Sequence, residues 1–346
     1  MKRKRNKAFF RVLAVGVVLA ILGTFIQLPY YVTKPGMATE LDPIIKVENG
    51  YKEDGEFMLT TIRMGKANIF SYAWAKVANY HEILPIKRVR RENESDEEYS
   101  NRQLYYMEDS QETAIAVAYK YADKHVTLKN NGIYIMGIVD GMPAEKELKP
   151  GDRIYAVDGM QIDEHTKFMN YVADKKDKDI ISIEIERNGE EKTVKIPLAP
   201  FPTNPEKIGI GIELITDIEV ETDPKVEIDT EKIGGPSAGL MFTLEIYNQL
   251  TEQDLTHGLR IAGTGTINID GQVGPIGGIG QKIVAAENSD VDIFFAPNEN
   301  GAVDSDYQQA LATAKDIKSD MKIVPVDTFE DALHFLENLD VDKIKN

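Results

Sequence analysis

One serine in this chain lies where nucleophilic chemistry is feasible. Ser237 is part of a Gly/Pro-rich run at 232–240, and an apolar, helix-like segment begins directly after it. A helix start exposes unpaired backbone N–H groups and the positive end of the helix dipole. A serine held there could attack a carbonyl with donors for the resulting oxyanion already in place.

The residues beside Ser237 suggest how an oxyanion would be bound. Pro236 has no N–H, so the simplest donors are the amides of Ser237 and Ala238. Gly235 and Gly239 carry no side chain and are expected to leave room for the backbone of a substrate.

A lysine 45 positions later could serve as the general base. Lys282 follows a glycine-rich, uncharged run and precedes the apolar residues 283–286. A serine hydroxyl needs a base to accept its proton, and a lysine can do so only when desolvation lowers its pKa. Thr264 could orient the amine through a hydrogen bond. Together these residues predict a serine peptidase with a Ser–Lys dyad.

Other interpretations of these motifs stay open at the level of residues alone. A Pro-Ser-Ala-Gly run can be an ordinary helix-capping turn, and a lysine in a helix is usually solvated. The glycine run departs from a phosphate-binding loop, because Gln281 separates the last glycine from Lys282 and Ile283 replaces the Ser/Thr of that motif.

The surrounding pattern predicts an α+β protein. Residues 57–64 read as a strand, 69–78 and 111–121 as helices, and the charged segment 83–103 as mobile. Short strands with one helix near 164–174 indicate a β-rich module, and the prolines at 198–206 indicate a linker. From about 208 onward, strands alternate with helices, and the chain closes with an amphipathic helix at 329–339.

Three motifs carry a resemblance to a known family. The runs 232–240, 263–267 and 271–286 closely resemble the proteolytic domain of Lon peptidases, in the family's order and approximate spacing. The resemblance covers about residues 208–340. It implies that Ser237 is the nucleophile, Lys282 the general base and Thr264 the supporting hydroxyl. Many Lon domains have an acidic residue two places before the Pro-Ser pair, where this chain has glycine.

The middle module resembles the PDZ domains attached to bacterial proteases. The runs 148–154 and 157–159 carry this likeness. It implies that an extended peptide adds a strand beside residues 133–138, with Ile133, Tyr134, Ile135 and Gly137 in the groove. A spacer that binds no peptide is the plainer alternative.

The N-terminus predicts a membrane anchor. Six of the chain's 40 basic residues lie within positions 1–11, which contain none of its 57 acidic residues. An apolar stretch from about 12 to 32 follows, long enough to span a bilayer, and the basic flank should stay in the cytoplasm. A cleaved signal peptide is the alternative, although no small-x-small site follows the apolar run.

These parts give a predicted order along the chain: basic tail and transmembrane anchor (1–32), extracytoplasmic region partly packed with the protease domain (33–125), PDZ domain (126–200) and α/β Lon-type domain (205–346). The whole resembles the membrane-anchored PDZ–Lon proteases of Gram-positive bacteria. That likeness implies peptide or small-protein substrates, no ATPase module and, by analogy with other Lon domains, a ring-shaped homo-oligomer.

Composition excludes several other classes. The chain has no cysteine and a net charge of −17, which argues against a thiol nucleophile, disulfides and nucleic-acid binding. The histidines form no zinc or catalytic pattern: His81, His125, His165, His257 and His334. We expect no metal, nucleotide or other cofactor. A non-enzymatic peptide-binding scaffold remains as the alternative function.

Overall fold

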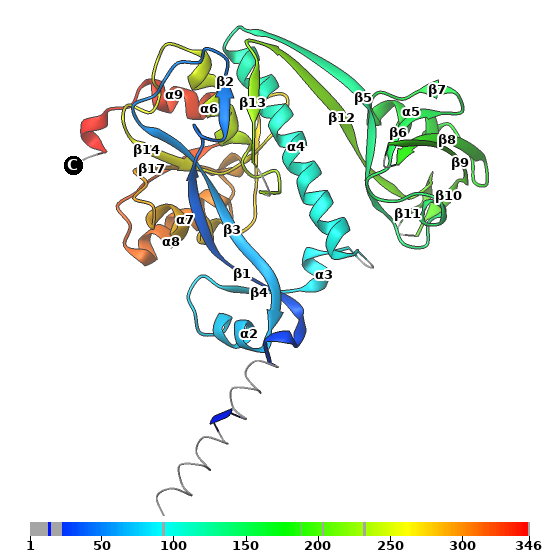
Figure 1. Ribbon diagram of the computed structural model, residues 1–346, viewed down its shortest axis with the longest axis horizontal. Helices are drawn as coiled ribbons and strands as arrows, with labels where there is room; N and C mark the ends of the chain where they lie inside the picture. The colour runs from blue at the N-terminus through cyan, green and yellow to red at the C-terminus, as the bar shows by residue number, and fades with distance from the viewer. Residues whose placement is uncertain are drawn as a thin grey trace, which may run out of the picture.

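A mixed β-sheet forms the centre of the larger of two folded units (Figure 1). The computed structural model describes residues 13–14, 23–91, 94–187, 189–202, 204–230 and 233–344. Within them the strand order of this sheet is β18-β17-β14-β3-β1-β4. The strands are β1 (Gln27–Glu40), β3 (Glu56–Asn68), β4 (Glu82–Pro85), β14 (Arg260–Gly263), β17 (Ile293–Pro297) and β18 (Lys322–Val326). Strands β3, β14, β17 and β18 run parallel, whereas β1 is antiparallel to both its neighbours.

Helices cover both faces of this sheet. Successive strand residues point to opposite faces, and apolar residues of β3 point to both. Phe57 and Leu59 of β3 join a core with the helices α4, α6 and α9, and the intervening Met58 joins a second core with α7 and α8. These helices are α4 (Asp96–Tyr121), α6 (Gly239–Leu250), α7 (Ile279–Glu287), α8 (Asp306–Ile317) and α9 (Phe329–Glu337).

Shorter elements complete this unit. They are β2 (Ile45–Val47) paired with β13 (Val226–Ile228), β15 (Thr266–Ile267) paired with β16 (Val273–Gly274), the helices α2 (Ile69–Ala75) and α3 (Ile86–Val89), and the 3-10 turns Glu299–Gly301 and Val341–Lys343.

The smaller unit is a sheet with its own apolar core. The strand order is β12-β5-β6-β8-β9, with β7 beside β6. Its elements are β5 (His125–Ile138), a 3-10 turn (Pro143–Lys146), β6 (Arg153–Val157), β7 (Met160–Gln161), α5 (His165–Ala173), β8 (Ile180–Arg187), β9 (Glu190–Pro197), β10 (Ala199–Phe201), β11 (Asn204–Gly209) and β12 (Ile212–Asp223). The long strands β5 and β12 pair from Ile138↔Ile212 to His125↔Asp223 and form a ribbon that joins the two units.

The smaller unit is therefore inserted within the larger one. Strands β1 and β3 and helix α4 precede it in the chain, yet they pack with the elements that follow it. The strand expected at 57–64 is present as part of β3, in the same sheet as the C-terminal strands.

Three expectations are corrected by the structure. Residues 27–40, expected to end an apolar span and then form a loop, are strand β1. The segment 83–103, expected to be mobile, contains β4, α3 and the first two turns of α4 in its described part. The stretch 198–206, expected to be a linker, contains most of a β10–β11 hairpin.

The predicted anchor falls mostly on residues outside the described ones. Among the residues that the structure describes, no helix has the length and apolarity needed to cross a membrane.

Candidate active site

The turn before α6 holds Ser237 in a fixed position. The Ser237 carbonyl accepts a hydrogen bond from the Gly265 amide at 2.9 Å, and the Gly265 carbonyl accepts one from the Leu240 amide at 3.2 Å. The turn is thus bound to the segment that follows β14. The amides of Ser237 and Ala238 precede the first residue of α6, Gly239, at the positive end of the helix dipole.

Helix α7 buries Lys282 beside this serine. Ile279 and Ile283 of α7 pack into the second core, and Lys282 itself is only 3% exposed. Its Nζ lies 2.8 Å from Ser237 Oγ and 2.7 Å from Thr264 Oγ1. The structure therefore brings together the three residues proposed for catalysis.

Thr264 connects the lysine to the serine turn. It directly follows β14, and its amide donates a hydrogen bond of 3.1 Å to the Phe295 carbonyl of the neighbouring parallel strand. Its hydroxyl accepts from Lys282 Nζ and donates to the Ser237 carbonyl at 2.9 Å. Because Thr264 is fully buried, this arrangement fixes the direction of the amine.

Burial changes the proton affinity of the lysine. Desolvation lowers the pKa of Lys282 to about 7, and the nearby carboxylate of Asp306 partly opposes the shift. Asp306 lies at the start of α8, where it accepts a hydrogen bond of 2.8 Å from the Ile276 amide. Burial in turn raises the pKa of Asp306. In the described part of the chain, no group of three or more His, Asp or Glu side chains is placed to bind a metal ion.

Asp306 was not recognised from the sequence. It is 24 residues from Lys282, in a segment without a recognisable motif, and only the packing of α7 against α8 brings it near. A carboxylate directly after a capping serine, Ser305, was the one local signal available.

A groove of about 800 Å³ opens onto the serine and the lysine. One wall is strand β3 at residues 60–64, and the opposite wall is α4, with Tyr99, Gln103, Leu104 and Met107. β14 pairs with β3 only up to Leu59, so beyond this point β3 has no described neighbour on the side away from β1. An extended peptide could hydrogen-bond to such an edge.

The two glycines proposed to admit substrate have other roles in the structure. The Gly235 amide donates a hydrogen bond of 2.8 Å to the Gln103 carbonyl, although the residue does line the groove. Its φ of +93° lies in the region that favours glycine. Gly239 is packed: an added Cβ would lie 2.8 Å from Ile267 and 2.9 Å from Ser110. The absence of a side chain at Gly239 thus allows the start of α6 to pack closely against Ile267 and Ser110.

The peptide groove expected in the smaller unit is not where the sequence placed it. Ile133 and Tyr134 pair with β12 on one side and β6 on the other, and Ile135 continues both contacts. Gly137 also pairs with β12, and Arg91 covers its open face. The proposal of Ile133, Tyr134, Ile135 and Gly137 as groove residues was therefore wrong: the first three have strand neighbours on both sides, and Arg91 covers Gly137.

A different groove of about 620 Å³ lies between α5 and the segment 206–214. α5 contributes His165, Phe168 and Met169 among others, and the facing segment is the end of β11 with the start of β12. This segment was visible in the sequence as a β-prone run interrupted by Gly209 and Gly211.

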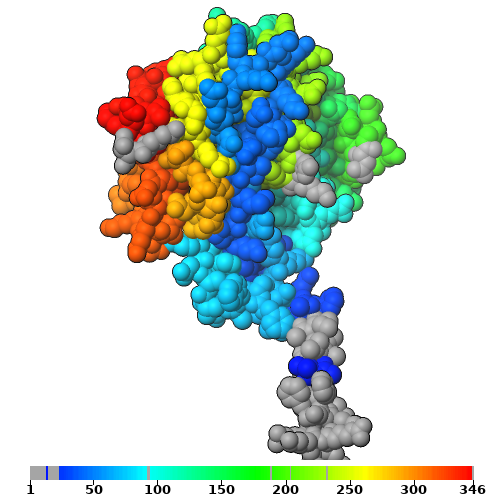
Figure 2. All heavy atoms as spheres, turned by 60° about the vertical axis from the view of Figure 1, so that its left-hand side comes forward, coloured from blue at the N-terminus to red at the C-terminus, as the bar shows by residue number. Residues whose placement is uncertain are grey.

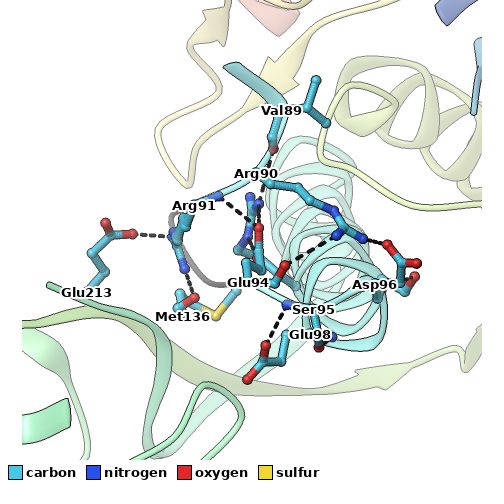
Figure 3. A network of polar contacts seen from close by, with 11 residues as sticks. Val89, Arg90, Arg91, Glu94, Ser95, Asp96, Glu98, Met136 and Glu213 are labelled. Carbon is cyan, nitrogen blue, oxygen red and sulfur yellow. Dashed lines mark hydrogen bonds and ion pairs between the residues drawn. The ribbon is translucent and has the colours of Figure 1, made fainter. Parts of the chain in front are cut away.

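Polar contacts join the smaller unit to the catalytic one (Figure 3). Arg91, just before α4, donates to the Met136 carbonyl of β5 and pairs with Glu213 of β12. Glu94 anchors this segment by accepting from the Arg91 amide at 3.0 Å and from the Arg102 guanidinium of α4 at 2.7 and 2.9 Å. Helix α4 lines the groove at Ser237, and β12 lines the groove beside α5. The polar contacts of Arg91 and Glu94 therefore connect an element of one groove to an element of the other.

Comparison with known proteins identifies two domains in this chain. A family model of the Lon protease (S16) C-terminal proteolytic domain matches residues 224–337, and a PDZ domain model matches residues 114–198. A Lon protease of Campylobacter concisus is 38% identical over 29% of this chain and 11% of its own length. A Lon protease of Metamycoplasma arthritidis is 30% identical over 42% of this chain and 16% of its own length.

Among solved structures, a PDZ domain of an SdrC-like protein from Listeria monocytogenes is 30% identical, covering 24% of this chain and 87% of its own, with a TM-score of 0.23. The chain spans less than a fifth of the length of the Lon proteases it matches. The chain thus joins a domain that matches the PDZ family model to a C-terminal domain that matches the Lon (S16) proteolytic model.

Proposed function

We propose that this protein is an ATP-independent, membrane-anchored endopeptidase with Ser237 as nucleophile and Lys282 as general base. The observation that supports this most is the buried contact of 2.8 Å between Lys282 Nζ and Ser237 Oγ. With its pKa at about 7, this lysine is neutral in a large fraction of molecules at neutral pH. A neutral amine can accept the proton that a serine must lose to attack.

In the proposed reaction, Ser237 Oγ attacks the carbonyl carbon of the scissile peptide bond while Lys282 Nζ takes the hydroxyl proton. The amides of Ser237 and Ala238 stabilise the negative charge that develops on the carbonyl oxygen. The ammonium of Lys282 then protonates the leaving amine, and the C–N bond breaks to give an acyl-serine. In the second half, Lys282 Nζ takes a proton from water while the water oxygen attacks the ester carbonyl carbon. The ammonium then returns this proton to Ser237 Oγ as the C–Oγ bond breaks, which releases the carboxylic acid and regenerates the neutral amine.

The groove favours extended chains as substrates. Strand β3 offers a free edge at 60–64, and an added strand there would bring a peptide carbonyl to Ser237. A folded protein cannot present its backbone in this way without unfolding. The substrates of this proposal are therefore flexible peptides, loops and small or unfolded proteins.

The PDZ domain is proposed to assist substrate capture. The segment 206–214 has α5 on one side, and between them runs the groove of about 620 Å³. An extended peptide would add to this strand, with side chains between it and α5. Its apolar lining, which includes Phe168 and Ile210, favours apolar residues in the bound peptide.

The location of the protein is also proposed from its sequence. The basic residues 1–11 stay in the cytoplasm, the apolar stretch that begins near 12 spans the membrane, and both folded domains lie outside the cell. Assembly into a ring, as an analogy with other Lon domains, belongs to the same proposal.

The test is cleavage of an unstructured protein such as casein, without nucleotide, by the full chain in detergent. We expect cleavage by the unaltered protein and none by Ser237→Ala or Lys282→Met. The matched control is Lys315→Met, because Lys315 is an exposed lysine on α8. Equal cleavage by Ser237→Ala would remove this serine as the nucleophile. No cleavage by any variant would favour a non-enzymatic scaffold.

A further inference from the structure

Helix α2 exposes an unusual number of large apolar side chains. Trp74 is 64% exposed, Phe70 48% and Val77, just after the helix, 75%. We call these residues, together with Ile69, Phe25 and Ile26, the α2 patch; every member is at least 42% exposed. Exposed apolar groups gathered in this way mark contact sites with proteins or membranes.

The patch is continuous with the start of the described chain. The Gly23 backbone lies against the Phe70 ring, since an added Cβ would be 2.8 Å from it. The chain from Gly23 then leads through the exposed Phe25 and Ile26 into β1. Figure 1 shows α2 at one end of the catalytic domain, beside the start of β1, and Figure 2 shows it on the surface there.

Charge distinguishes this end from the rest of the protein. The chain contains 57 acidic residues, but its two longest stretches without any are 1–39 and 57–81. These stretches come together in the structure, because β1 pairs with β3 from Gln27↔Asn68 to Ala38↔Thr60. The patch therefore adjoins two strands whose residues paired over this range carry no acidic side chain. Of the acidic residues beside them, Glu82 lies on β4 next to Thr33, and Asp96 is paired with Lys66 and Arg90.

The composition of the patch also suits a bilayer surface. Tryptophan and tyrosine concentrate at the level of lipid headgroups, where lysine can extend its charge toward water. Tyr30 and Tyr72 pack with ring centroids 5.2 Å apart beside the patch, and the ammonium of Lys76 lies 5.2 Å from the Tyr72 ring centroid. An interface between two copies of the chain would need apolar groups but would not call for two adjoining stretches without acidic residues.

We propose that the α2 patch rests on the outer surface of an anionic membrane, with Trp74 at the boundary between headgroups and acyl chains. The proposal depends on the membrane anchor of the proposed function and adds a second contact to it. Two contacts fix the orientation of the domain, which a single flexible tether does not.

This contact would set the height of the active site above the lipid. Strand β3 leads from Thr60 in the catalytic groove to Asn68, the residue that caps α2. At about 3.3 Å per strand residue, the groove lies roughly 30 Å or less from the patch. Peptide segments that emerge from the membrane near the protein could reach this distance.

The chain provides its own reporter, because Trp74 is its only tryptophan. The full chain would be reconstituted into vesicles of phosphatidylcholine and phosphatidylglycerol, with and without lipids brominated at shallow acyl positions. We expect blue-shifted emission from Trp74 in vesicles and a loss of its intensity with brominated lipid. Val77→Glu should reduce the quenching, whereas Val303→Glu, at a residue 93% exposed elsewhere, should not.

A control variant moves the tryptophan. In Trp74→Phe combined with Tyr51→Trp, the reporter follows β2, at the opposite end of the domain from α2 in Figure 1. Tyr51 is 48% exposed, and we expect its replacement to emit as a water-exposed tryptophan without quenching.

Emission of Trp74 that is water-exposed and unquenched would overturn the proposal. Blue-shifted emission without quenching would also overturn it and assign the patch to a second copy of the chain. Failure of the anchor is seen separately, as release of the protein by an alkaline wash. Failure of the peptidase proposal is seen as absence of casein cleavage in detergent. Neither result depends on the fluorescence of Trp74.

Discussion

The pH dependence of peptide cleavage tests the role of Lys282 most directly. If this lysine is the base, the rate follows its neutral fraction. With a pKa of about 7, the neutral fraction is about 10% at pH 6 and about 90% at pH 8, so kcat/KM should rise about ninefold and then level off. A lysine with an ordinary pKa would instead give an increase of about 100-fold over this range with no plateau.

The assay is the initial cleavage rate of an internally quenched peptide at low substrate concentration, across the range from about pH 5.5 to 9.5. Circular dichroism at each pH would confirm that the protein stays folded. A flat profile, or a rise that continues through the alkaline range without a plateau, would refute a buried lysine that titrates near neutrality.

The same titration has a measurable effect on stability. Lys282 has a lower pKa in the folded protein, so between about 7 and 10.5 the unfolded chain binds more protons and stability rises with pH. Below pH 7 the folded protein carries the full free-energy cost of burying the charged Lys282 ammonium, which is on the order of 5 kcal/mol for a pKa shift of this size. Lys282→Met removes this cost and loses two hydrogen bonds worth about 1 kcal/mol each.

We therefore expect Lys282→Met to be more stable than the unaltered protein by about 3 kcal/mol at pH 6, measured by urea denaturation. The advantage should shrink as the pH approaches 10. If Lys282→Met were less stable than the unaltered protein at pH 6, burial would not be lowering the pKa of Lys282 as described.

Three further variants test other parts of the site. Asp306→Asn removes a carboxylate that raises the pKa of Lys282, so the pH–rate profile should move to lower pH; a shift to higher pH would contradict this cause. Gly239→Ala places a methyl group against Ile267 and should lower stability by about 1–2 kcal/mol in urea denaturation, with reduced cleavage; unchanged values would show that the turn has space. Arg91→Ala removes contacts to the PDZ domain and should increase hydrogen exchange at residues 133–138; unchanged exchange would show that other contacts hold the domain.

The residues of the candidate active site could be predicted from the sequence because each lies within a short, recognisable motif. Ser237 and Lys282 are 45 residues apart, yet each motif specifies its own local structure. Ser237 lies in a turn directly before helix α6, and Lys282 lies in helix α7 after a glycine-rich loop. The contact between the two motifs depends on the central sheet, which brings them together. The hydrophobic pattern of the sequence predicted most strands and helices of the C-terminal half.

The start of α4 was missed although its signal was present. Ser95 caps the helix by accepting from the Glu98 amide, and Glu98 accepts in return from the Ser95 amide. This Ser-x-x-Glu capping box can be recognised from sequence. The high charge of the segment 83–103 led instead to the prediction of mobility, because charge alone does not distinguish a solvated helix face from a loop.

The PDZ groove was misplaced for a different reason. Residues 133–138 have the strongest strand pattern of the module, and this pattern marks a central strand that is buried on both faces. A peptide requires an edge, and the strand next to α5 comes from residues 206–214, after the expected boundary at 200. Sequence order within the module could not reveal which strand lies at that edge.

The antiparallel pairing of β5 with β12 has an evolutionary consequence. Both ends of the PDZ domain leave the catalytic domain side by side, at His125 and Asp223. A gene segment encoding a different module, or only a tight hairpin, could therefore replace residues 126–222 without moving either junction. This architecture allows recognition modules to be exchanged while the hydrolytic machinery is inherited unchanged.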